Sequence, residues 1–305
     1  MGQRTSPPTE TAEPRHRSGF VTIAGRPNVG KSTLLNQLLG QKVAIVTAKP
    51  QTTRNRILGI KTLPEAQILF IDTPGLHTAR TLINRRMVEA ATRAVEEADV
   101  VLLVVDAVEG VTPADRELAG RLTTVSRPLC VVVNKIDRLN RLQVLPLLAT
   151  LDQLLPGRDV VPVSALKKTN LDALVAVIVR LLPEGPRLYD ADALTDQTER
   201  TLVQEVVREK VLMQTRDEIP YAVAVTVDAF EEKPNVTVIT ATIHVERDSQ
   251  KGVLIGQRGA RIREIGRAAR LELEHMLGRR IYLELFVRVQ EEWTKREALL
   301  KEFGL

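Results

Sequence analysis

The stretch GRPNVGKST, Gly25 to Thr33, decides the fold of this 305-residue chain. It follows the apolar run FVTIA and precedes KSTLLNQLLG, so we expect a buried strand to enter the loop and a helix to leave it. Its spacing of Gly, four residues, Gly, Lys and Ser is that of a P-loop, in which backbone N–H groups at a helix N-terminus point at phosphate oxygens. In that geometry Lys31 neutralises the outer phosphates and the Ser32 hydroxyl binds Mg²⁺.

Apolar runs rich in β-branched residues recur along the first 183 residues, and each is followed by a polar turn and a helix-like stretch. Continuous apolar runs are typical of strands buried on both faces, and their alternation with helices predicts a mostly parallel, doubly wound sheet of the α/β class. Residues 170–185 are predicted to form a closing helix that ends at Pro183 and Gly185. The predicted strands are GFVTIAG, AQILFID, ADVVLLVVDA, RPLCVVVNKID and VVPVSAL.

The motif NKID, Asn134 to Asp137, ends one of these strands and is placed to select the base of a nucleotide. The Asp137 carboxylate can accept hydrogen bonds from both the ring N–H and the exocyclic amine of guanine, whereas adenine offers no such pair of donors. A site built on these bonds rejects an analogue that lacks them by roughly 10⁴ or more, so we expect GTP to be preferred over ATP. Asn134 would steady the loop, the Lys135 stem would cover the base, and backbone N–H groups of SAL, Ser164 to Leu166, would meet the guanine carbonyl.

The motif DTPG, Asp72 to Gly75, follows the strand AQILFI and completes the phosphate end of the site. Asp72 can reach Mg²⁺ through a water, and the Gly75 N–H can meet the γ-phosphate. The preceding segment KPQTTRNR is polar and lacks periodicity, as a mobile switch does, and Thr53 is preferred over Thr52 as the second hydroxyl on Mg²⁺. All these motifs fall at the carboxyl ends of strands, where open α/β sheets bind ligands.

These motifs define the expected nucleotide site. Its nucleotide-binding residues are Gly25, Arg26, Pro27, Asn28, Val29, Gly30, Lys31, Ser32, Thr33, Asp72, Thr73, Pro74, Gly75, Leu76, Asn134, Lys135, Ile136, Asp137, Ser164, Ala165 and Leu166. Its Mg²⁺ ligands are Ser32, Thr53 and, through a water, Asp72.

Changes in composition predict the domain boundaries. Residues 1–18 are rich in proline, charge and hydroxyls and nearly lack large apolar side chains, so they are expected to be a mobile tail. We expect the α/β domain over residues 19–183, a linker over 184–197 and a second domain over 198–305. The second domain shows a different order of elements: a helix at about 198–214, strands at 221–230 and 235–247, a helix, the turn discussed next, a helix at 260–277, a strand at 281–289 and a last helix from about Glu291.

A second glycine turn, GQRG from Gly256 to Gly259, stands in this α+β domain. It lacks the Lys-Ser pair that ends a P-loop, and no buried parallel strand enters it, so nucleotide binding there is not expected. The pattern fits the Gly-x-x-Gly clamp between two helices by which a KH domain, here of type II by its order of elements, holds about four nucleotides of single-stranded nucleic acid. Glycines at both ends let the sugar-phosphate backbone approach, and Arg258 supplies charge.

The helix after this turn carries an apolar face with a stripe of arginines beside it. Between Lys251 and Arg270 there are six basic residues and one acidic residue, so the local field is positive although the chain from residue 186 onward is slightly acidic. Such a patch predicts salt-sensitive binding of a polyanion, and an aromatic content of 3% disfavours recognition by stacked aromatic side chains. A plain solvated basic face is the alternative. The expected RNA-binding residues are Lys251, Gly256, Gln257, Arg258, Gly259, Arg263, Arg267 and Arg270.

Composition and charge limit the class of protein. Hydrophobic residues make up 44% and charged residues 27%, as in ordinary globular proteins, and no apolar run approaches the roughly 18 residues of a membrane span. No secretory signal is visible, so a cytosolic location is expected. The net charge of +5 permits a polyanionic partner without demanding one. Cys130 lies in an apolar run and is expected to be a buried core residue.

Together, GRPNVGKST, DTPG, NKID and SAL look like the motifs of a translational GTPase, and with the C-terminal domain the chain from about Gly19 onward resembles the bacterial Era family. The resemblance implies slow GTP hydrolysis, binding of single-stranded RNA near the 3′ end of 16S ribosomal RNA, a role in assembling the small ribosomal subunit, and a cytosolic pool partly attached to the inner membrane surface. Two alternatives stay open: an RNA-binding adaptor that binds GTP with negligible hydrolysis, and a membrane-signalling GTPase whose basic patch meets anionic lipid.

The resemblance also bears on catalysis. Signalling GTPases use a glutamine of this loop to position the attacking water, whereas the residue after Gly75 is Leu76, whose apolar side chain cannot orient a water. The resemblance implies that Asn28, with backbone oxygens around residues 51–53, holds a K⁺ ion in place of an arginine finger; a plain loop residue is the alternative. His77 is a candidate base, against a solvent-facing loop imidazole. The residues assigned to catalysis are Lys31, Asn28, Thr53 and Gly75.

Overall fold

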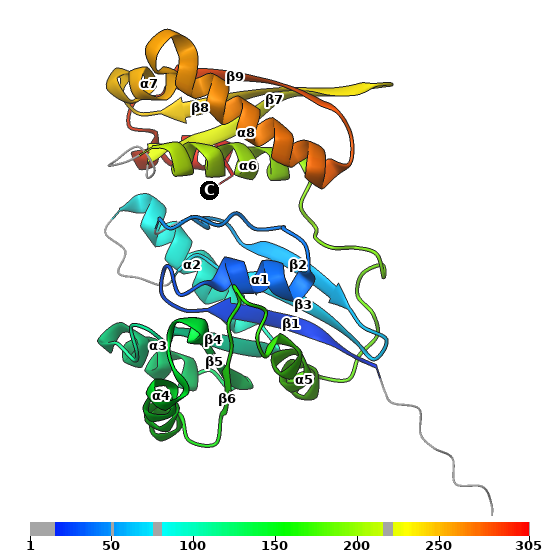
Figure 1. Ribbon diagram of the computed structural model, residues 1–305, viewed down its shortest axis with the longest axis vertical. Coiled ribbons are helices and arrows are strands. Elements are labelled where there is room, and N and C mark those ends of the chain that lie inside the picture. The colour runs from blue at the N-terminus through cyan, green and yellow to red at the C-terminus, as the bar shows by residue number, and fades with distance from the viewer. Residues whose placement is uncertain (1–15, 50–51, 76–80, 216–221, 305) are drawn as a thin grey trace, which may run out of the picture.

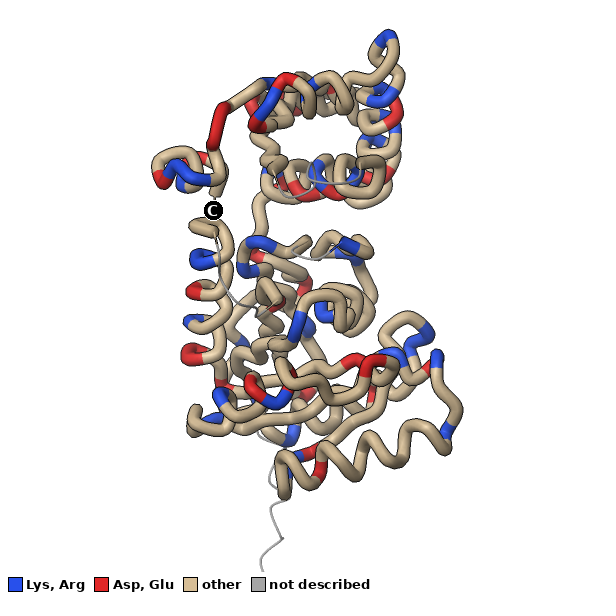
Figure 2. The backbone as a smooth tube through the Cα atoms, turned by 90° about the vertical axis from the view of Figure 1, so that its left-hand side faces the viewer, with Lys and Arg blue, Asp and Glu red and all other residues tan. Residues whose placement is uncertain are grey.

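The computed structural model of the chain describes residues 16–49, 52–75, 81–215 and 222–304, which form two domains. Figure 1 shows the N-terminal domain below and the C-terminal domain above it along the longest axis. Each domain has its own hydrophobic core, one drawn from residues 21–182 and the other from residues 203–281. Figure 2 shows Lys and Arg interspersed with Asp and Glu in both domains, so neither domain carries charge of a single sign.

The first domain is built on a six-stranded sheet with the order β2-β3-β1-β4-β5-β6. Strands β1, β3, β4, β5 and β6 run parallel, and β2 pairs antiparallel with β3 at the edge. The doubly wound α/β fold is thereby confirmed. Strand β2 is absent from the expected set because a tight turn joins it to β3, so it lacks the helix that marks the other strands. The bounds are β1 (Arg17–Ala24), β2 (Ile57–Thr62), β3 (Ala66–Asp72), β4 (Val100–Asp106), β5 (Leu129–Asn134) and β6 (Asp159–Pro162).

Helices cover both faces of this sheet, which explains why its strands are apolar throughout. Leucines of α1 and α5 pack on one face, whereas α3 and α4 pack on the other. Helix α3 begins with a capping box between Thr112 and Asp115 and with Pro113 in its first turn, as helix-start chemistry predicts. The bounds are α1 (Lys31–Leu39), α2 (Leu82–Glu97), α3 (Pro113–Thr123), α4 (Arg141–Leu154) and α5 (Leu171–Leu181).

The ends of this domain differ from the expected boundaries. Strand β1 begins at Arg17, so the expected tail of residues 1–18 is too long at its end, while residues 1–15 lie outside the described part of the chain. The expected linker, residues 184–197, is bound along the sheet edge. The Gln67 side chain accepts from the Tyr189 N–H at 2.9 Å and donates to the Tyr189 carbonyl at 2.9 Å. The Ile60 N–H donates to the Leu194 carbonyl at 2.8 Å.

The second domain is the α+β fold expected for a type II KH domain. Its three strands lie in the order β7-β8-β9, with β7 antiparallel and β9 parallel to β8. The buried valines of α6 and the face Ile265, Ala269 and Leu273 of α8 pack in one cluster with this sheet, as the spacing of apolar residues predicts. The bounds are α6 (Glu199–Gln214), β7 (Ala224–Lys233), β8 (Val236–Val245), α7 (Asp248–Ile255), α8 (Ala260–Leu277) and β9 (Ile281–Val289).

The end of the chain does not form the helix expected from Glu291. Glu292 has a left-handed backbone with φ of 51°, and a short 3₁₀ turn over Trp293–Lys295 follows it. Arg296 is extended, so the last helix, α9 (Glu297–Glu302), begins only after it. Trp293, in the short turn before α9, is buried and packs with Ile83 and Met87 of α2. This apolar contact joins the two domains.

Candidate functional site

The carboxyl ends of β1, β3, β5 and β6 meet at one edge of the six-stranded sheet and carry the four sequence motifs. A cavity of about 390 Å³ opens there. Its lining includes Lys31 and Ser32 of the loop after β1, Thr53 of the polar segment, Gly75 and Lys135. Parallel strands therefore bring together residues that are far apart in the sequence, as the motif order predicts.

The loop between β1 and α1 requires glycine at its two motif positions. Gly25 has φ of +151°, and a Cβ there would lie 2.6 Å from the Val104 carbonyl oxygen. Gly30 has φ of +97°, and a Cβ there would lie 2.4 Å from Asn134 Nδ2. The Gly25 contact is with backbone and forbids a side chain, and the left-handed backbone of Gly30 strains one, so both positions favour glycine.

The Lys31 ammonium lies folded back under this loop. Its Nζ donates to the carbonyls of Gly25 at 3.0 Å and Arg26 at 2.9 Å, and the side chain is buried. Burial lowers the pKa of Lys31 to about 8, although Asp72 nearby opposes that shift. The protein thus keeps a desolvated cation at the place where phosphate is expected.

Three oxygen-bearing side chains converge beside Lys31. Ser32 Oγ lies 2.6 Å from Asp72 Oδ2 and 2.9 Å from Thr53 Oγ1, and Thr53 Oγ1 lies 3.3 Å from the same carboxylate oxygen. Asp72 is fully buried, its Oδ1 has no hydrogen-bond partner, and burial raises its pKa. Hydroxyl and carboxylate oxygens are the donors that Mg²⁺ prefers, so this set fits the ion. Within the described residues, no group of three or more His, Cys, Asp and Glu side chains offers another metal site.

The end of the site that is expected to select the base is held by hydrogen bonds between loops. Asn134 Nδ2 donates to the Val29 carbonyl at 2.9 Å, and Asn134 Oδ1 accepts from the Ala165 N–H at 3.0 Å. Asp137 is exposed, with its Oδ1 accepting from the Ser164 hydroxyl at 2.5 Å. The NKID and SAL loops therefore lie together against the P-loop, with the Asp137 carboxylate at the open side.

Several expected nucleotide-binding residues act differently in detail. The Arg26 side chain turns away to ion pairs with Asp115 and Glu109, both at 2.9 Å, so only its backbone faces the loop interior. The Ala165 N–H is engaged by Asn134, and the Leu166 side chain is exposed. Leu76 falls outside the described part of the chain, as do His77, the candidate base, and Gln51, a candidate for the K⁺ site.

Asp106 is a site residue that sequence reasoning missed. It ends β4 and accepts from Lys135 Nζ at 2.5 Å, while the same ammonium donates to the Asn28 carbonyl at 2.6 Å. This ion pair fixes the Lys135 stem across the P-loop, which is the position expected of a side chain that covers the base. The signal was available, because Asp106 closes the run ADVVLLVVDA at the same end of the sheet as the motifs.

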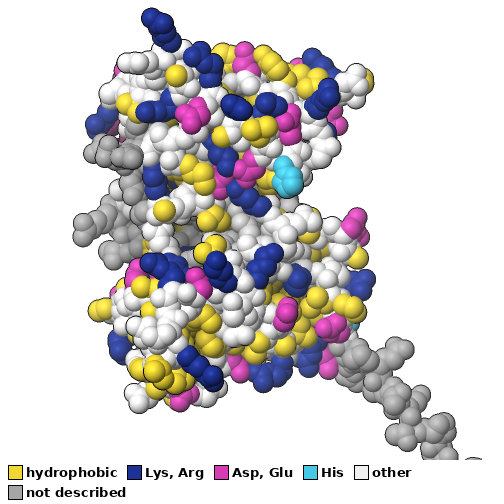
Figure 3. All heavy atoms as spheres, in the orientation of Figure 1, with side chains coloured by type: hydrophobic (Ala, Val, Ile, Leu, Met, Phe, Trp, Pro, Cys, Tyr) yellow, Lys and Arg dark blue, Asp and Glu magenta, His cyan; other side chains and the backbone are white. Residues whose placement is uncertain are grey.

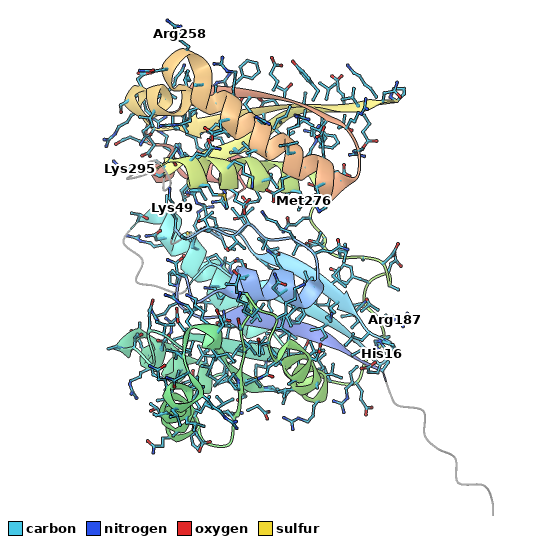
Figure 4. The ribbon with its side chains drawn as sticks, viewed as in Figure 1. His16, Lys49, Arg187, Arg258, Met276 and Lys295 are labelled. Atoms are coloured by element: carbon cyan, nitrogen blue, oxygen red, sulfur yellow. The ribbon has the colours of Figure 1, made fainter. Side chains whose placement is uncertain are left out.

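The Gly-x-x-Gly turn lies between α7 and α8 and has the backbone of a tight clamp. Gly256, Arg258 and Gly259 have φ of 70°, 50° and 75°. A Cβ on Gly256 would lie 2.9 Å from Arg261 Cβ, so this glycine is required by a close approach. Figure 4 shows Arg258 pointing into solvent at the outer tip of the C-terminal domain, away from the nucleotide cavity.

The expected basic stripe is only partly available to a polyanion. Arg263 and Arg267 are exposed on α8, and Figure 3 shows Lys and Arg side chains around this tip of the molecule. Arg270 instead pairs with Glu274 at 2.9 Å one turn further along the same helix. Lys251 lines a separate cavity of about 590 Å³ between α7 and the strands β8 and β9. The structure thus places Gly256 to Gly259 in the turn and Arg263 and Arg267 on the exposed side of the helix that follows it, whereas Lys251 lines the separate cavity.

Comparisons with known proteins agree with both halves of this geometry. The family model described as "50S ribosome-binding GTPase" matches residues 20–135, and the model described as "KH domain" matches residues 218–294. GTPase Era of Geotalea daltonii is 50% identical over 295 residues, covering 96% of this chain and 99% of that protein. GTPase Era of Geobacter metallireducens is 49% identical over 290 residues, covering 94% and 97%. The chain belongs to the GTPase Era family.

Membership of the Era family confirms that the chain joins a GTP-hydrolysing domain to an RNA-binding KH domain. An Aquifex aeolicus Era variant crystallised with GDP·AlF4⁻ is 45% identical with a TM-score of 0.92, covering 94% of this chain and 99% of that chain. The crystal structure of an Era in complex with MgGDPNP and nucleotides 1506–1542 of 16S ribosomal RNA is also 45% identical, with a TM-score of 0.93 and coverage of 95% and 99%.

No helix in the part of the chain that the structure describes could cross a membrane. Each helix there is too short or too polar to traverse a bilayer. Cys130 is fully buried, as expected, and burial raises the pKa of its thiol to about 12. A thiol with that pKa stays protonated at neutral pH and acts as a packing group.

Proposed function

We propose that this chain is a GTP-dependent switch that grips single-stranded RNA of the 3′ region of 16S ribosomal RNA and assists assembly of the small ribosomal subunit. The observation that supports this most is that four converging guanine-nucleotide motifs and a Gly-x-x-Gly clamp occur in one chain. An Era relative of nearly the same length and fold holds MgGDPNP and nucleotides 1506–1542 of that RNA together. Two ligands of different chemistry are thus matched by two separate glycine turns.

In the proposed hydrolysis, each of the converging groups has one role. Ser32 and Thr53 would hold Mg²⁺ directly and Asp72 would hold it through a water; the bound ion neutralises phosphate charge. Lys31 Nζ would leave the Gly25 and Arg26 carbonyls for oxygens of the outer phosphates, and the Gly75 N–H would donate to the γ-phosphate. A Cβ on Gly75 would lie 2.7 Å from the Pro27 nitrogen, which keeps this backbone against the P-loop. We infer a slow intrinsic rate, because Leu76 follows Gly75.

We propose further that Asn28 holds a K⁺ ion at the phosphate end of the cavity. Asn28 has a left-handed backbone with φ of 65°, and its Nδ2 donates to the Ala48 carbonyl at 3.3 Å. That contact joins the P-loop to the loop between α1 and β2, and it leaves the amide oxygen of Asn28 as the atom that would bind the cation. A positive charge there would stabilise charge that develops on the phosphates in the transition state.

Replacing Na⁺ by K⁺ at equal ionic strength is therefore expected to raise the rate of GTP hydrolysis by at least about tenfold. Asn28→Ala should remove most of that difference, since it deletes the oxygen ligand. Steady-state phosphate release for both proteins in both salts measures the effect, and GDP affinity in each salt controls for a general salt effect. Equal rates in all four conditions would show that no K⁺ acts at this site.

The RNA half of the proposal is tested by a charge placed in the clamp. Gly259→Asp should weaken binding of an RNA oligonucleotide of the 16S 3′ region by about 100-fold. The new carboxylate repels phosphate, and it would also pair with Arg263, whose Nη1 would lie 3.4 Å from a Cβ at residue 259. Fluorescence anisotropy with the full-length protein and GTP, at two salt concentrations, measures the affinity.

Gly259→Asn is the matched control for this variant, because asparagine has the same shape and tolerates the left-handed backbone equally but carries no charge. We expect it to lose no more than about fivefold in RNA affinity, and basal GTP hydrolysis should stay unchanged in both variants. RNA binding by Gly259→Asp at the level of the unaltered protein would overturn the clamp assignment. The same assay with vesicles of anionic lipid in place of RNA tests the membrane-signalling alternative.

The proposed location is the cytosol, with a pool attached peripherally to the inner membrane surface. The basic patch at the tip of the KH domain supports at most a weak contact, because stable anchoring needs a second signal such as a lipid chain. The RNA-binding adaptor without useful hydrolysis is not favoured, since the chain belongs to a family of GTPases.

A further inference from the structure

The loop between α1 and β2, which carries Thr53, is bound to the KH domain along most of its described length. We call residues 42–49 and 52–54 the switch segment. Glu209 of α6 is fully buried and accepts from the Val46 N–H at 2.9 Å and from Lys42 Nζ at 2.7 Å. Lys49 Nζ donates to the carbonyls of Leu212 and Thr215 at the C-terminal end of the same helix. Figure 4 shows Lys49 at the level where the two domains meet, beneath α6.

Both neighbours of Thr53 in the chain are bonded to the KH domain. Arg208 Nη2 of α6 donates to the Thr52 carbonyl at 2.5 Å. On the other side, Arg54 Nη1 donates to the Val223 carbonyl at 2.7 Å. Thr53 itself points the opposite way, into the nucleotide cavity, where its hydroxyl lies 2.9 Å from Ser32 Oγ. The hydroxyl assigned to Mg²⁺ is therefore presented by a piece of backbone that the second domain holds from both sides.

Arg208 is built to make this contact. It is only 4% exposed, and Glu205 one turn before it accepts from Arg208 Nε at 2.9 Å and from Nη2 at 2.6 Å. The two bonds fix the plane of the guanidinium and direct Nη2 at the Thr52 carbonyl, while Nη1 is buried without a hydrogen-bond partner among the described residues. Because Arg208 is held by Glu205 on its own helix and bonds the Thr52 carbonyl, the placement of the switch segment is linked to the placement of α6.

A charged cluster reinforces the link at the start of the switch segment. Lys42 bonds both Glu209 of α6 and Glu272 of α8, and Lys210 bonds the same two carboxylates. Figure 3 shows acidic and basic side chains next to one another at the waist between the two lobes. Only the two Lys42 pairs cross from one domain to the other, since Lys210 and both carboxylates belong to the KH domain. The switch segment is thus bonded to the KH domain at Lys42, Val46, Lys49, Thr52 and Arg54.

We propose that Arg208 of the KH domain is a positioning residue for GTP hydrolysis, which acts through the Thr52 carbonyl to hold the Thr53 hydroxyl at the metal position. The inference deepens the proposed function and rests on its assignment of Thr53 to Mg²⁺. Switch segments of this kind are ordered by contacts to the γ-phosphate and Mg²⁺ and are released after hydrolysis. Arg208 therefore serves the GTP state, whereas the affinity for GDP is set by the P-loop and the NKID loop.

The test uses full-length protein with four substitutions. Arg208→Met removes the donors and keeps the buried stem. Arg208→Lys keeps one donor and tests rescue. Glu205→Gln is the matched control, because it removes the charge and one of the two acceptors that pair with Arg208 but leaves the Arg208 donors and the Thr52 carbonyl unchanged. Thr53→Ala tests the assignment on which the inference rests. For each protein we would measure kcat for GTP, the Mg²⁺ concentration that gives half-maximal rate, the affinity for GDP, and the thermal unfolding midpoint.

Arg208→Met is expected to lower kcat about tenfold and to raise the Mg²⁺ concentration that gives half-maximal rate several-fold, because one charge-assisted hydrogen bond is lost. The affinity for GDP should stay within twofold of that of the unaltered protein. Arg208→Lys should recover part of the rate, and Glu205→Gln should stay within about threefold. If Arg208→Met does not fold, Arg208→Lys alone decides by its Mg²⁺ requirement.

The outcomes separate the two claims. A Thr53→Ala protein with unchanged kcat and Mg²⁺ requirement would remove Thr53 from the metal and with it both the assignment and the inference. An impaired Thr53→Ala protein beside a folded Arg208→Met protein with unchanged kcat and Mg²⁺ requirement would overturn the inference alone. Equal losses of GTP and GDP affinity in Arg208→Met would also overturn it, because general damage to the pocket does not distinguish the two nucleotides.

Discussion

Asp137→Asn is expected to lower the affinity for GTP and GDP by about 10⁴-fold, which corresponds to about 5.5 kcal/mol of binding free energy. The Asp137 carboxylate stands at the open side of the base end and is oriented by the Ser164 hydroxyl at 2.5 Å. An asparagine amide at this position points a donor at the donors of guanine. Xanthine carries a carbonyl where guanine has its amine, so the same variant should bind xanthosine triphosphate more tightly than GTP. Calorimetry with GTP, GDP, ATP and xanthosine triphosphate measures the change in base specificity.

Asp152→Asn provides the control for charge, since Asp152 is exposed on α4 and its loss changes the net charge equally. We expect that variant to bind GTP within twofold of the unaltered protein. A loss of less than tenfold in Asp137→Asn, or a loss without a gain for xanthosine triphosphate, would show that the base is selected by other groups. Backbone amides of the SAL loop would then be the next candidates, and among them the Leu166 N–H, because the Ala165 N–H is donated to Asn134.

The parts of the site that local sequence could predict are those that one strand and one turn determine. Ser32, Asp72 and Asn134 each follow an apolar run by a fixed spacing, and parallel strands bring their carboxyl ends to one edge whatever the connecting helices contain. The same logic predicts the Gly256 to Gly259 turn, because glycines between two amphipathic stretches demand a sharp bend. These features depend on interactions between residues close together in the chain, which the local sequence determines.

The parts that could not be predicted depend on contacts between distant segments. An arginine in the P-loop, such as Arg26, is expected to bind phosphate. Its side chain instead pairs with Glu109 and Asp115, which belong to a different βα connection. Arg208 reads as one more exposed arginine on a helix, and only the placement of the KH domain against the switch segment buries it. The periodicity of the sequence does not predict either contact, because each pairs residues more than 80 positions apart.

Lys31→Met is expected to lower kcat/KM for GTP by about 10³-fold, the second large effect at this site. The Lys31 ammonium is the buried cation nearest to the three oxygen ligands, and its present partners are the carbonyls of Gly25 and Arg26. Methionine keeps the volume of the stem and removes the charge that a triphosphate would meet. Lys61→Met is the matched control, because Lys61 Nζ likewise donates to a backbone carbonyl, that of Leu38 at 2.8 Å, away from the cavity.

The same substitution should change how the stability of the nucleotide-free protein depends on pH. Burial lowers the pKa of Lys31 from 10.5 to about 8 in the folded chain, while the unfolded chain keeps the ordinary value. Between these two pH values the unfolded chain binds more protons than the folded chain, so the contribution of Lys31 to the unfolding free energy rises with pH. Below pH 8 the full cost of burying the charge is present, up to about 3 kcal/mol.

Urea unfolding of both proteins without nucleotide, at several pH values from 7 to 10, measures this difference. The unfolding free energy of the unaltered protein minus that of Lys31→Met should rise with pH across the window from about 8 to 10.5 and stay flat below it, since groups away from Lys31 titrate alike in both proteins and cancel. A difference that is flat through pH 10 would mean that Lys31 is hydrated in the nucleotide-free protein. The lysine would then not be a desolvated charge that phosphate relieves, and GTP binding would gain nothing from releasing that cost.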